Sequence, residues 1–167
     1  YEVLAGDFHV HAFPQTWSTL TPIETVIEPA GQGLDVAAIV PHARVWPSQI
    51  ARWFADRTGG PIVLTGEEIT NPGYHLLGIG IERRVPTDLT AAQAIDAVHR
   101  QDGVAIAAHP YRGMWPAYDE GAMRVLDAAE IVRPETPHWP EGAADLREFS
   151  ARASLAAIGS SDYHGAG

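Results

Sequence analysis

Short apolar runs alternate with longer segments of mixed polarity along most of the chain. The runs are rich in Val, Ile, Leu and Ala, as expected for strands that are buried on both faces. The longer segments carry apolar residues three or four positions apart, which is the period of a helix with one buried side. Strands are expected at residues 1–5, 35–40, 62–64, 74–81, 104–108, 129–132 and 155–159, and helices at residues 21–30, 47–57, 89–101, 119–126 and 141–153.

This order of elements predicts an α/β fold with a largely parallel sheet. One link differs from the others, because Asn71-Pro72-Gly73 is a tight turn that is too short to contain a crossover helix. The strands on either side of this turn are therefore expected to pair as an antiparallel hairpin. No repeat, low-complexity stretch or change of composition divides the chain, so residues 1–167 are interpreted as one domain.

Polar residues follow the expected strands at nearly every C-terminal end. Together with His75, which lies at the turn end of the hairpin, the set comprises His9, His11, His42, Glu67, Glu68, His109, Asp162 and His164. In a closed α/β barrel the C-terminal ends of the strands meet on one face, where the active site lies. An open sheet would spread the same residues along a line. The pattern therefore favours a barrel of about seven strands, with a shared metal site on that face.

The first of these residues form a His-x-His pair, His9 and His11. Residues two apart in a strand point to the same side, so both imidazoles are expected to face one metal ion. Asp7 would lie behind them on that side and orient one of the rings. His99, in the middle of an expected helix, and His138, in a proline-rich loop, are interpreted as ordinary histidines without a metal.

For four acidic residues, the sequence pattern only partly decides whether the side chain faces the proposed metal site. Of Glu67 and Glu68, strand parity allows one to face the site, and the alternation alone does not select between them. Asp35 begins a strand and would lie at the opposite end of the barrel, so we expect a structural role. Glu130 lies within a strand, where a hydrogen-bonded buried carboxylate and a member of the site are equally consistent with the sequence.

The composition narrows the possible functions. The chain of 167 residues is 46% hydrophobic and 19% charged, which is ordinary for a globular protein. No apolar run approaches the ~18 residues that a membrane-spanning helix needs. A net charge of -10 and the lack of a basic run argue against binding to a nucleic-acid backbone, which needs clustered basic side chains. The chain begins with Tyr1 rather than Met, so it could be a piece of a longer protein.

Cysteine and lysine are absent, and all 11 basic residues are arginines. Without Cys there is no disulfide, thiolate nucleophile or sulfur ligand, so a metal must be held by His, Asp and Glu. That donor set suits zinc, manganese or iron. Without Lys there is no Schiff-base chemistry and no P-loop lysine. The lack of Cys is compatible with both oxidising and reducing compartments.

Taken together, these stretches resemble the PHP (polymerase and histidinol phosphatase) superfamily of metal-dependent phosphoesterases. The matching segments follow the family's order over nearly the whole chain: Asp7-Phe8-His9-Val10-His11, Gly33-Leu34-Asp35 leading to Pro41-His42, Gly66-Glu67-Glu68-Ile69-Thr70, His75-Leu76-Leu77-Gly78, Ala108-His109-Pro110 and Gly159-Ser160-Ser161-Asp162-Tyr163-His164. The Gly-Glu-Glu-Ile-Thr variant also resembles the branch that contains carbaryl hydrolase-like esterases.

The resemblance implies a distorted (β/α)7 TIM-like barrel that holds two or three divalent metal ions. Because the sequence ends soon after the seventh expected strand, the barrel could be incomplete at its C-terminal end. By this resemblance, the first metal would be held by His9, His11, Glu68 and Asp162. The second would be held by Glu68 as a bridging ligand together with His75 and His109, and a third by His42 and His164.

The sequence departs from the family pattern at two places. The family usually has an Asp just before the histidine, where this chain has Pro41, and a carboxylate a few residues after the first His-x-His, where residues 13–17 have none. The third position therefore has His42 and His164 but no evident acid. Two metal ions are expected, with the third position open.

The residues and the resemblance together predict a hydrolase of small phosphomonoesters that acts by attack of a metal-bridging hydroxide. His42 or His164 could give a proton to the leaving oxygen. Arg112 could clamp a phosphoryl oxygen, with Arg44 as a second candidate. Four aromatic residues on loops could stack on an aromatic leaving group or simply pack on the barrel rim; they are Trp17, Trp46, Tyr111 and Trp115.

Two alternatives stay open at this point. The same metals could serve the hydrolysis of an aryl ester or carbamate, or the barrel could be degenerate and bind metal or a partner without turnover. Metal content, and assays on a phosphate and a carboxylic ester, would separate these possibilities. The natural substrate, the metal and the oligomeric state are left open by the sequence.

Overall fold

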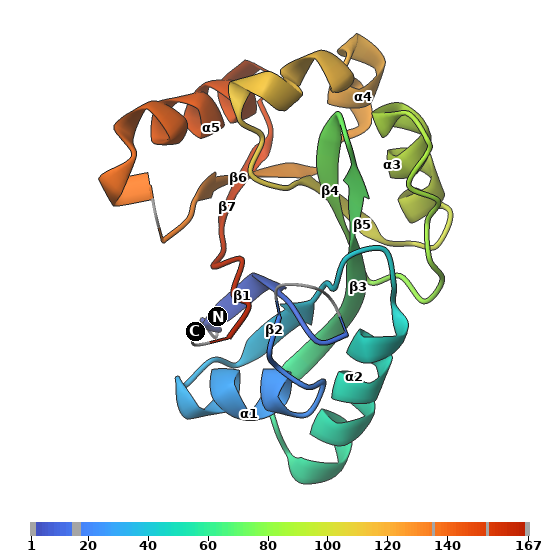
Figure 1. The fold of residues 1–167 in the computed structure, drawn as a ribbon, viewed down its shortest axis with the longest axis vertical. Helices are drawn as coiled ribbons and strands as arrows, with labels where there is room; N and C mark the ends of the chain where they lie inside the picture. Colours follow the sequence, from blue (N-terminus) through green and yellow to red (C-terminus); the bar gives the residue numbers. More distant parts are fainter. Residues whose placement is uncertain (1–2, 15–17, 135, 153, 166–167) are drawn as a thin grey trace.

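The computed structural model describes residues 3–14, 18–134, 136–152 and 154–165. Within these residues, seven strands form one sheet in chain order, with helices between most of them (Figure 1). The strands are β1 (Gly6–Val10), β2 (Val36–Ile39), β3 (Ile62–Asn71), β4 (Tyr74–Ile79), β5 (Val104–Ala107), β6 (Ala128–Val132) and β7 (Ala156–Gly159). The helices are α1 (Glu24–Gly31), α2 (Trp46–Thr58), α3 (Ala91–His99), α4 (Glu120–Val125) and α5 (Pro140–Arg152), with 3₁₀ helices η1 (Arg112–Ala117) and η2 (Thr136–His138).

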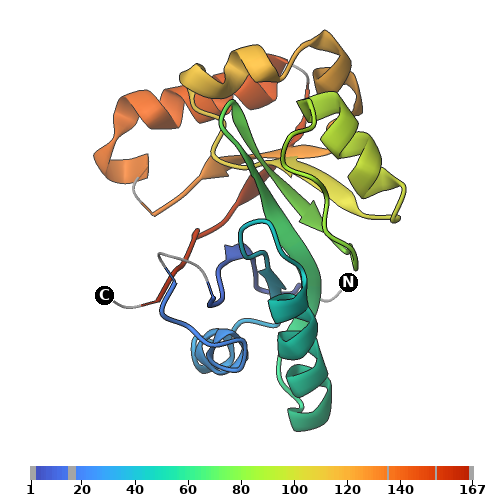
Figure 2. The same ribbon diagram turned by 45° about the vertical axis from the view of Figure 1, so that its right-hand side comes forward.

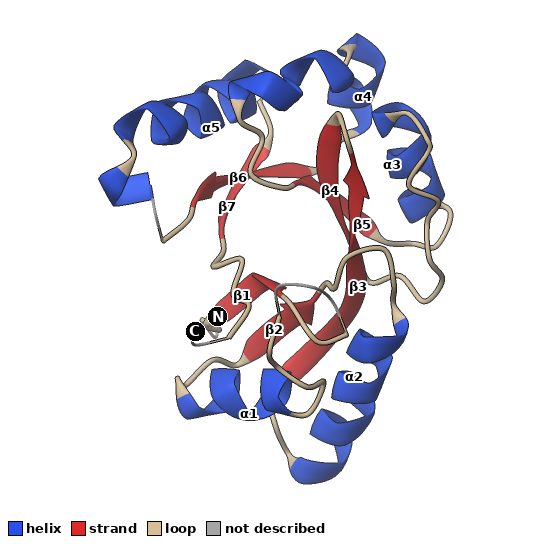
Figure 3. Cartoon of the chain, in the orientation of Figure 1, coloured by secondary structure: helices blue, strands red, loops and turns tan. Residues whose placement is uncertain are grey.

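The sheet is largely parallel and nearly closes into a barrel (Figure 3). Only β4 among these strands is antiparallel to its neighbours, β3 and β5. The two ends of the sheet meet where Val10 forms a parallel bridge with Tyr163. There the His11 N–H donates to the Tyr163 carbonyl at 2.8 Å, and the Tyr163 N–H donates to the His9 carbonyl at 3.1 Å. The α/β class, the barrel and the hairpin expected from the sequence are confirmed.

Helices cover the outside of the strands in two groups, with α1 and α2 beside β1 to β3 and α3, α4 and α5 beside β4 to β7 (Figures 1 and 2). Local sequence fixes several helix ends. Thr90 and Gln93 exchange side-chain to backbone hydrogen bonds at the start of α3, which is a capping box. Asp119 accepts the Ala122 N–H at 2.9 Å at the start of α4, and Gly59 ends α2 in the left-handed conformation.

The ten-residue strand β3 changes partner along its length. Its first half pairs with β2 in parallel, and its second half, from Gly66 onwards, pairs with β4 in the antiparallel sense. At Gly66 the neighbouring strand comes so close that a Cβ would lie 2.4 Å from the Gly78 carbonyl oxygen. Glycine is therefore needed where the sheet turns from one partner to the next.

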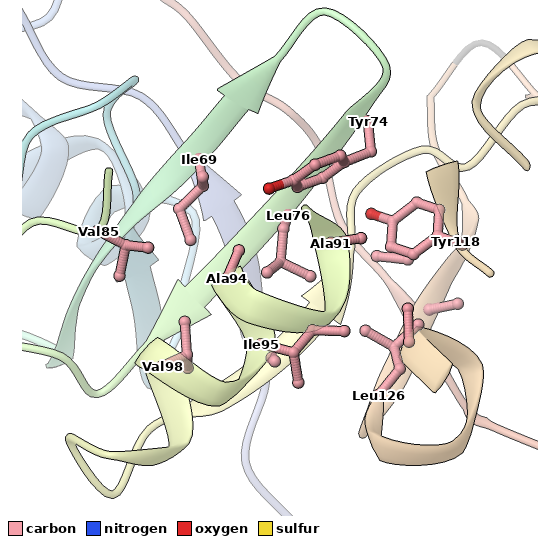
Figure 4. Close-up of a cluster of buried hydrophobic side chains, with 14 of the residues drawn as sticks. Ile69, Tyr74, Leu76, Val85, Ala91, Ala94, Ile95, Val98, Tyr118 and Leu126 are labelled. Carbon is pink, nitrogen blue, oxygen red and sulfur yellow. The ribbon is translucent and has the colours of Figure 1, made fainter. Parts of the chain in front are cut away.

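Alternation along the strands separates a core inside the barrel from the cores under the helices. The inner core takes at least one apolar side chain from each strand, including Phe8, Ala38, Leu64, Leu77, Ile106, Ala128 and Ile158. The largest outer core packs α3 and α4 against β4 and β5, with Leu76 and Ile95 among its members (Figure 4). Adjacent residues Leu76 and Leu77 thus belong to different cores, as the two-residue period of a strand requires.

The first strand begins later than predicted. Of the expected strand over residues 1–5, residues 3–5 precede β1, and residues 1–2 lie outside the described part of the chain. The Ala5 N–H donates to the Asp35 carboxylate at 2.8 Å, so Asp35 has the structural role that we expected for it. The segment between the strand expected at residues 104–108 and the helix expected at 119–126 contains η1. None of the helices that the structure describes combines the length and apolar character needed to cross a membrane.

Candidate metal centre

Eight side chains meet at one end of the barrel. The hairpin explains the place of His75, because the start of an antiparallel strand lies at the same end as the C-termini of the parallel strands. Glu68 pairs with Leu77 in the β3–β4 ladder and so points to the inside. The side chains form three groups in which the potential ligand atoms lie within 4.8 Å of one another, and they belong to His9, His11, His42, Glu68, His75, His109, Asp162 and His164.

The first group consists of His9, His11, Glu68 and Asp162. The Nε2 atoms of His9 and His11 are 2.9 Å apart. Asp162 Oδ1 lies 3.2 Å from the first of these nitrogens and 2.9 Å from the second, and Glu68 Oε2 lies 3.5 and 3.4 Å from them. Two imidazole nitrogens and two carboxylate oxygens are therefore close enough to share one divalent cation.

The second group is built around the other oxygen of Glu68. Glu68 Oε1 lies 2.8 Å from His75 Nδ1 and 3.1 Å from His109 Nε2. Each oxygen of this carboxylate thus faces a different set of imidazoles, which is the arrangement of a carboxylate that bridges two cations. His109 and Asp162 both have positive φ angles, +32° and +54°, and such strained backbone is typical of functional sites.

The third group, His11, His42 and His164, contains imidazoles alone. The rings of His11 and His164 stack with centroids 4.0 Å apart. His42 Nδ1 lies 2.6 Å from Thr70 Oγ1, and His164 Nδ1 lies 2.7 Å from the Asp162 carbonyl oxygen. Protein atoms therefore already engage two of these rings, and among the described residues this group is the weakest donor set for a cation.

Unsatisfied buried atoms indicate that the cluster fits a cation. Glu68 has no exposed surface, yet its Oε2 has no hydrogen-bond partner in the described part of the chain, and neither does His75 Nδ1. Each of these atoms lies close to another potential metal ligand: His42 Nδ1 is 2.8 Å from Glu68 Oε2, and Glu68 Oε1 is 2.8 Å from His75 Nδ1. A buried carboxylate oxygen without a partner is costly, and a cation would remove that cost.

The protonation states of the cluster also suit a cation. Burial alone would raise the pKa of Glu68, but the hydrogen bond from His109 and the neighbouring imidazoles hold it well below its usual value. Burial would likewise raise the pKa of Asp162, but two imidazoles and Arg133 hold it low. Burial lowers the pKa of His11 to about 4. At neutral pH both carboxylates are therefore ionised and His11 is neutral, as metal binding requires. Burial opposes a charge on His9, but Glu130 and Glu68 raise its pKa well above the usual value, so a cation would have to displace a proton from this ring.

A buried carboxylate behind the cluster fixes two of these histidines. Glu130, on β6, has no exposed surface. Its Oε1 lies 2.7 Å from His9 Nδ1 and accepts the Ser160 hydroxyl, while its Oε2 accepts the His109 backbone N–H at 2.7 Å. With Glu130 beside Nδ1, the Nε2 atom of His9 faces the cluster, where a cation would replace a proton on that nitrogen. Glu130 is thus both satisfied by hydrogen bonds and part of the site.

The prediction that Asp7 orients a ligand imidazole is wrong. Asp7 Oδ1 accepts the backbone N–H groups of His9 and Ser161, both at 3.1 Å. The β1–β2 ladder shifts register between Asp7 and Val10, and such a bulge interrupts the simple alternation that put Asp7 beside the imidazoles. Asp7 therefore braces the backbone where the two ends of the sheet meet, and Glu130 has the role expected of Asp7.

The two arginines predicted to clamp a phosphoryl oxygen are engaged elsewhere. Arg112 pairs with Asp145 and Glu148 of α5, at 3.0 and 2.9 Å, and 59% of its side chain is exposed. Arg44 donates to the Pro14 carbonyl at 2.7 Å. The charge of Arg112 is thus paired with an outer helix, and its action in the site stays a prediction.

Of the four aromatic residues expected near the site, Tyr111 stands beside the cluster. Its ring lies 6.1 Å from that of His109, with an angle of 21° between the planes. Trp115 donates its indole N–H to the Pro110 carbonyl and packs against Phe149 in the outer core. Trp46 is the first residue of α2, with 46% of its surface exposed. Trp17 lies outside the residues that the structure describes.

Sequence reasoning missed Arg133, which lies one residue beyond β6. Its guanidinium donates to Asp162 Oδ2 and, at 3.0 Å, to the Tyr111 hydroxyl, and only 12% of its side chain is exposed. It brings a positive charge to the edge of the cluster. Its position directly after a strand is the signal that could have found it, since the same rule found the histidines.

Glu67 points away from the cluster. It has no exposed surface, its Oε1 accepts the Val85 backbone N–H, and its Oε2 lacks a hydrogen-bond partner among the described residues. Burial raises the pKa of Glu67 to about 7. Of the two adjacent glutamates, strand geometry therefore turns Glu68 to the site.

Comparisons with known proteins support the fold. No family model matches the chain. An uncharacterized protein of Methanocaldococcus jannaschii is 24% identical over 140 residues, which cover 77% of this chain and 81% of that protein. This relative carries no statement of activity.

Three solved structures share the barrel. One is a two-domain protein of Bacteroides vulgatus that contains a predicted PHP-like metal-dependent phosphoesterase, with a TM-score of 0.70 and 19% identity over 96% of this chain. This chain spans about half, 52%, of its length. The second is a proposed metal-dependent phosphoesterase of Bifidobacterium adolescentis, with a TM-score of 0.70 and 20% identity. The match covers 98% of this chain and 89% of that protein. The third is an amidohydrolase of Chromobacterium violaceum, solved with sulfate and no metal, with a TM-score of 0.74 and 15% identity. The match covers 97% of this chain and 88% of that protein.

These identities show a common PHP-type fold, so the chemistry has to be argued from the site itself. The narrower resemblance to the carbaryl hydrolase-like branch stays a prediction.

Proposed function

We propose that the protein is a metal-dependent hydrolase that cleaves small phosphomonoesters at a two-cation centre. The observation that carries this proposal is the position of Glu68, whose Oε1 faces His75 and His109 while its Oε2 faces His9 and His11. Two cations bridged in this way are suited to in-line displacement at phosphorus. The solved structures of the same fold include two that are named as predicted or proposed metal-dependent phosphoesterases, which supports the proposal.

In this proposal the first two groups hold one cation each and share Glu68. The donor set of imidazoles and carboxylates suits zinc, manganese or iron. His42 and His164 would hold a third cation weakly or act as free imidazoles. When bound, the cations would lower the pKa of a water molecule and polarise the phosphoryl group.

The chain's own residues then orient groups and move protons. Glu130 keeps His9 aligned and fixes the backbone of His109. His42 and His164 lie on the more open side of the cluster, with 27% and 25% of their side chains exposed. Either imidazole could give a proton to the departing oxygen.

A carboxylic ester or carbamate is the second candidate substrate. It is favoured by the lack of a carboxylate in the third group, because a centre with only two cations supplies less positive charge to a phosphate dianion. A carboxylic ester or carbamate carries no charge at the group that reacts, so it needs less positive charge from the centre. The relative from Chromobacterium violaceum, which is named an amidohydrolase, has the same fold.

Assays of the purified, manganese-loaded protein on p-nitrophenyl phosphate and on a p-nitrophenyl carboxylic ester test the proposal. We expect turnover of the phosphate, loss of turnover in Glu68→Gln, and retention in His99→Asn, whose histidine pairs with Asp127 instead. Turnover of the ester alone would establish the second candidate. No turnover of either compound, with less than one metal ion per chain by elemental analysis, would indicate a degenerate, non-catalytic metal-binding barrel.

A further inference from the structure

We propose that Tyr111 and Trp139 form a binding surface for a planar aromatic group on the substrate, so that the protein favours aryl phosphates over alkyl phosphates. This inference rests on the proposed function. The two rings lie 4.6 Å apart at an angle of 44°, and we call the pair the aromatic wall. Trp139 is 43% exposed, so part of its ring is available to a ligand.

The aromatic wall is joined to both proposed cation positions. The ring of Tyr111 lies 6.1 Å from that of His109, which belongs to the second group. The Tyr111 hydroxyl accepts a hydrogen bond from Arg133, and Arg133 also donates to Asp162 of the first group. A phosphoryl group that spans the two cations would therefore have the aromatic wall beside its leaving group.

The cluster is accessible at the edge where the aromatic wall stands. The side chains of His109 and Asp162 are 10% and 15% exposed, whereas those of His9 and His11 are fully buried. The side chains of His42, His75 and His164 are 25–27% exposed, so the cluster is open over several strands and its edge beside Tyr111 is one part of that opening. Arg133 acts here as a positioning residue, because it ties the aromatic wall to a proposed metal ligand.

Gly142, in the first turn of α5, seats the ring of Trp139. A Cβ at this position would lie 2.5, 2.6 and 2.8 Å from three atoms of that ring. Glycine inside a helix is less favourable than alanine, and here it allows the indole to lie close to the helix backbone. Trp139 thus packs against both Gly142 and Tyr111 and offers its remaining exposed part to a ligand. A surface held in place before binding loses less entropy when a ligand packs on it.

Gly142→Ala therefore displaces Trp139 without touching the cluster, and Trp139→Leu removes the ring. The probes are phenylphosphonate and methylphosphonate, measured as competitive inhibitors of alkyl phosphate hydrolysis by the manganese-loaded protein. They carry the same charge and have no leaving group. We expect wild type to bind phenylphosphonate more tightly, and both variants to reduce that preference about 3- to 10-fold, the size of one aromatic stacking contact.

Three further measurements complete the test. Trp139→Phe should keep most of the preference, and Trp53→Leu, which removes an exposed tryptophan from α2, should keep all of it. Inhibition by methylphosphonate should be unchanged in every variant, which shows that the cluster is intact. Thermal unfolding of Gly142→Ala should show a folded protein.

Two results would overturn the inference, and they are distinguishable. The aromatic wall would be contradicted if the wild-type protein hydrolysed phosphate esters but bound the two phosphonates equally. It would also be contradicted if the variants kept the wild-type preference. Neither result would contradict the proposed function. If the wild-type protein neither hydrolysed a phosphate ester nor bound either phosphonate, both the aromatic wall and the proposed function would be contradicted.

Discussion

Glu130 accepts three hydrogen bonds inside the barrel, from the His9 ring, the Ser160 hydroxyl and the His109 backbone. Glutamine has one acceptor oxygen and one donor amide in place of two acceptor oxygens, so at least one of these donors would face an N–H group. We expect Glu130→Gln to weaken metal binding about 10- to 100-fold, as is typical when the partner of a metal-bound histidine is changed. Calorimetric titration of the metal-free protein with manganese measures this loss.

Ser160→Ala is the matched control, because it removes one of the three donors and leaves the carboxylate in place. Its affinity for manganese should stay close to that of wild type. If Glu130→Gln bound manganese as tightly as wild type, His9 would have to be oriented by something other than this carboxylate.

Glu67 makes stability depend on pH. Burial raises the pKa of its carboxyl to about 7 in the folded protein, against a usual value of 4.5. Between these two values the unfolded chain loses the proton while the folded one keeps it, so the contribution of Glu67 to stability falls as pH rises and is lost above about pH 7. Glutamine cannot ionise and keeps an acceptor for the Val85 N–H.

We therefore expect the free energy of unfolding of Glu67→Gln, relative to wild type, to improve by about 1–3 kcal/mol between pH 5 and pH 8. Urea unfolding of both proteins in EDTA at the two pH values measures the difference without a contribution from metal. Curves that differ by the same amount at both pH values would show that Glu67 is ionised throughout.

The candidate site shows which residues a sequence can place and which it cannot. The histidines were predictable because strand ends are local properties of the chain. Strand parity left Glu67 and Glu68 open, and only the resemblance to a family selected Glu68. Asp7 was misplaced because a bulge in β1 cannot be seen in the alternation. The ion pairs of Arg112 were not predictable, because Asp145 and Glu148 lie more than thirty residues further along the chain.

At the scale of elements, the partner change of β3 at Gly66 organises the sheet. An alanine there would bring its Cβ within 2.4 Å of the Gly78 carbonyl oxygen, and the backbone would have to move. We expect Gly66→Ala to lower the free energy of unfolding by about 1–3 kcal/mol, the usual cost of overpacking. Gly31→Ala is the control, since nothing lies within 4 Å of the added atom. Equal stability of the two variants in urea would contradict the tight contact.

Element boundaries were predictable where the sequence itself marks them. The hairpin follows from the turn residues before Tyr74, and α4 follows from the capping residue Asp119. The start of β1 was not predictable from its apolar residues, because the chain before Gly6 is held by Asp35 rather than by a strand ladder. The partner change within β3 was likewise invisible, since Gly66 alone does not specify which strand approaches it.

At the scale of the whole molecule, the proposed ligands join parts of the chain that are far apart. The first group takes His9 and His11 from the start of the chain and Asp162 from its end, on opposite sides of the seam where the barrel closes. Within the described residues, the recorded backbone contacts across this seam involve His9, Val10, His11 and Tyr163, together with Thr19 and His164. A cation in the first group would therefore strengthen the part of the sheet that has the shortest ladder.

Amide hydrogen exchange can test this effect directly. We expect manganese to slow exchange at the N–H groups of His11 and Tyr163, which make the seam bonds, more than at Leu77 in the longer ladders of β4. The reason is that local opening of the seam needs less free energy than opening of the central strands, and bound cations would have to be released before the seam opens. Slowing of the same size at Leu77 would show that the cations stabilise the fold as a whole. No slowing at His11 and Tyr163 would mean that the seam opens without disturbing the first group.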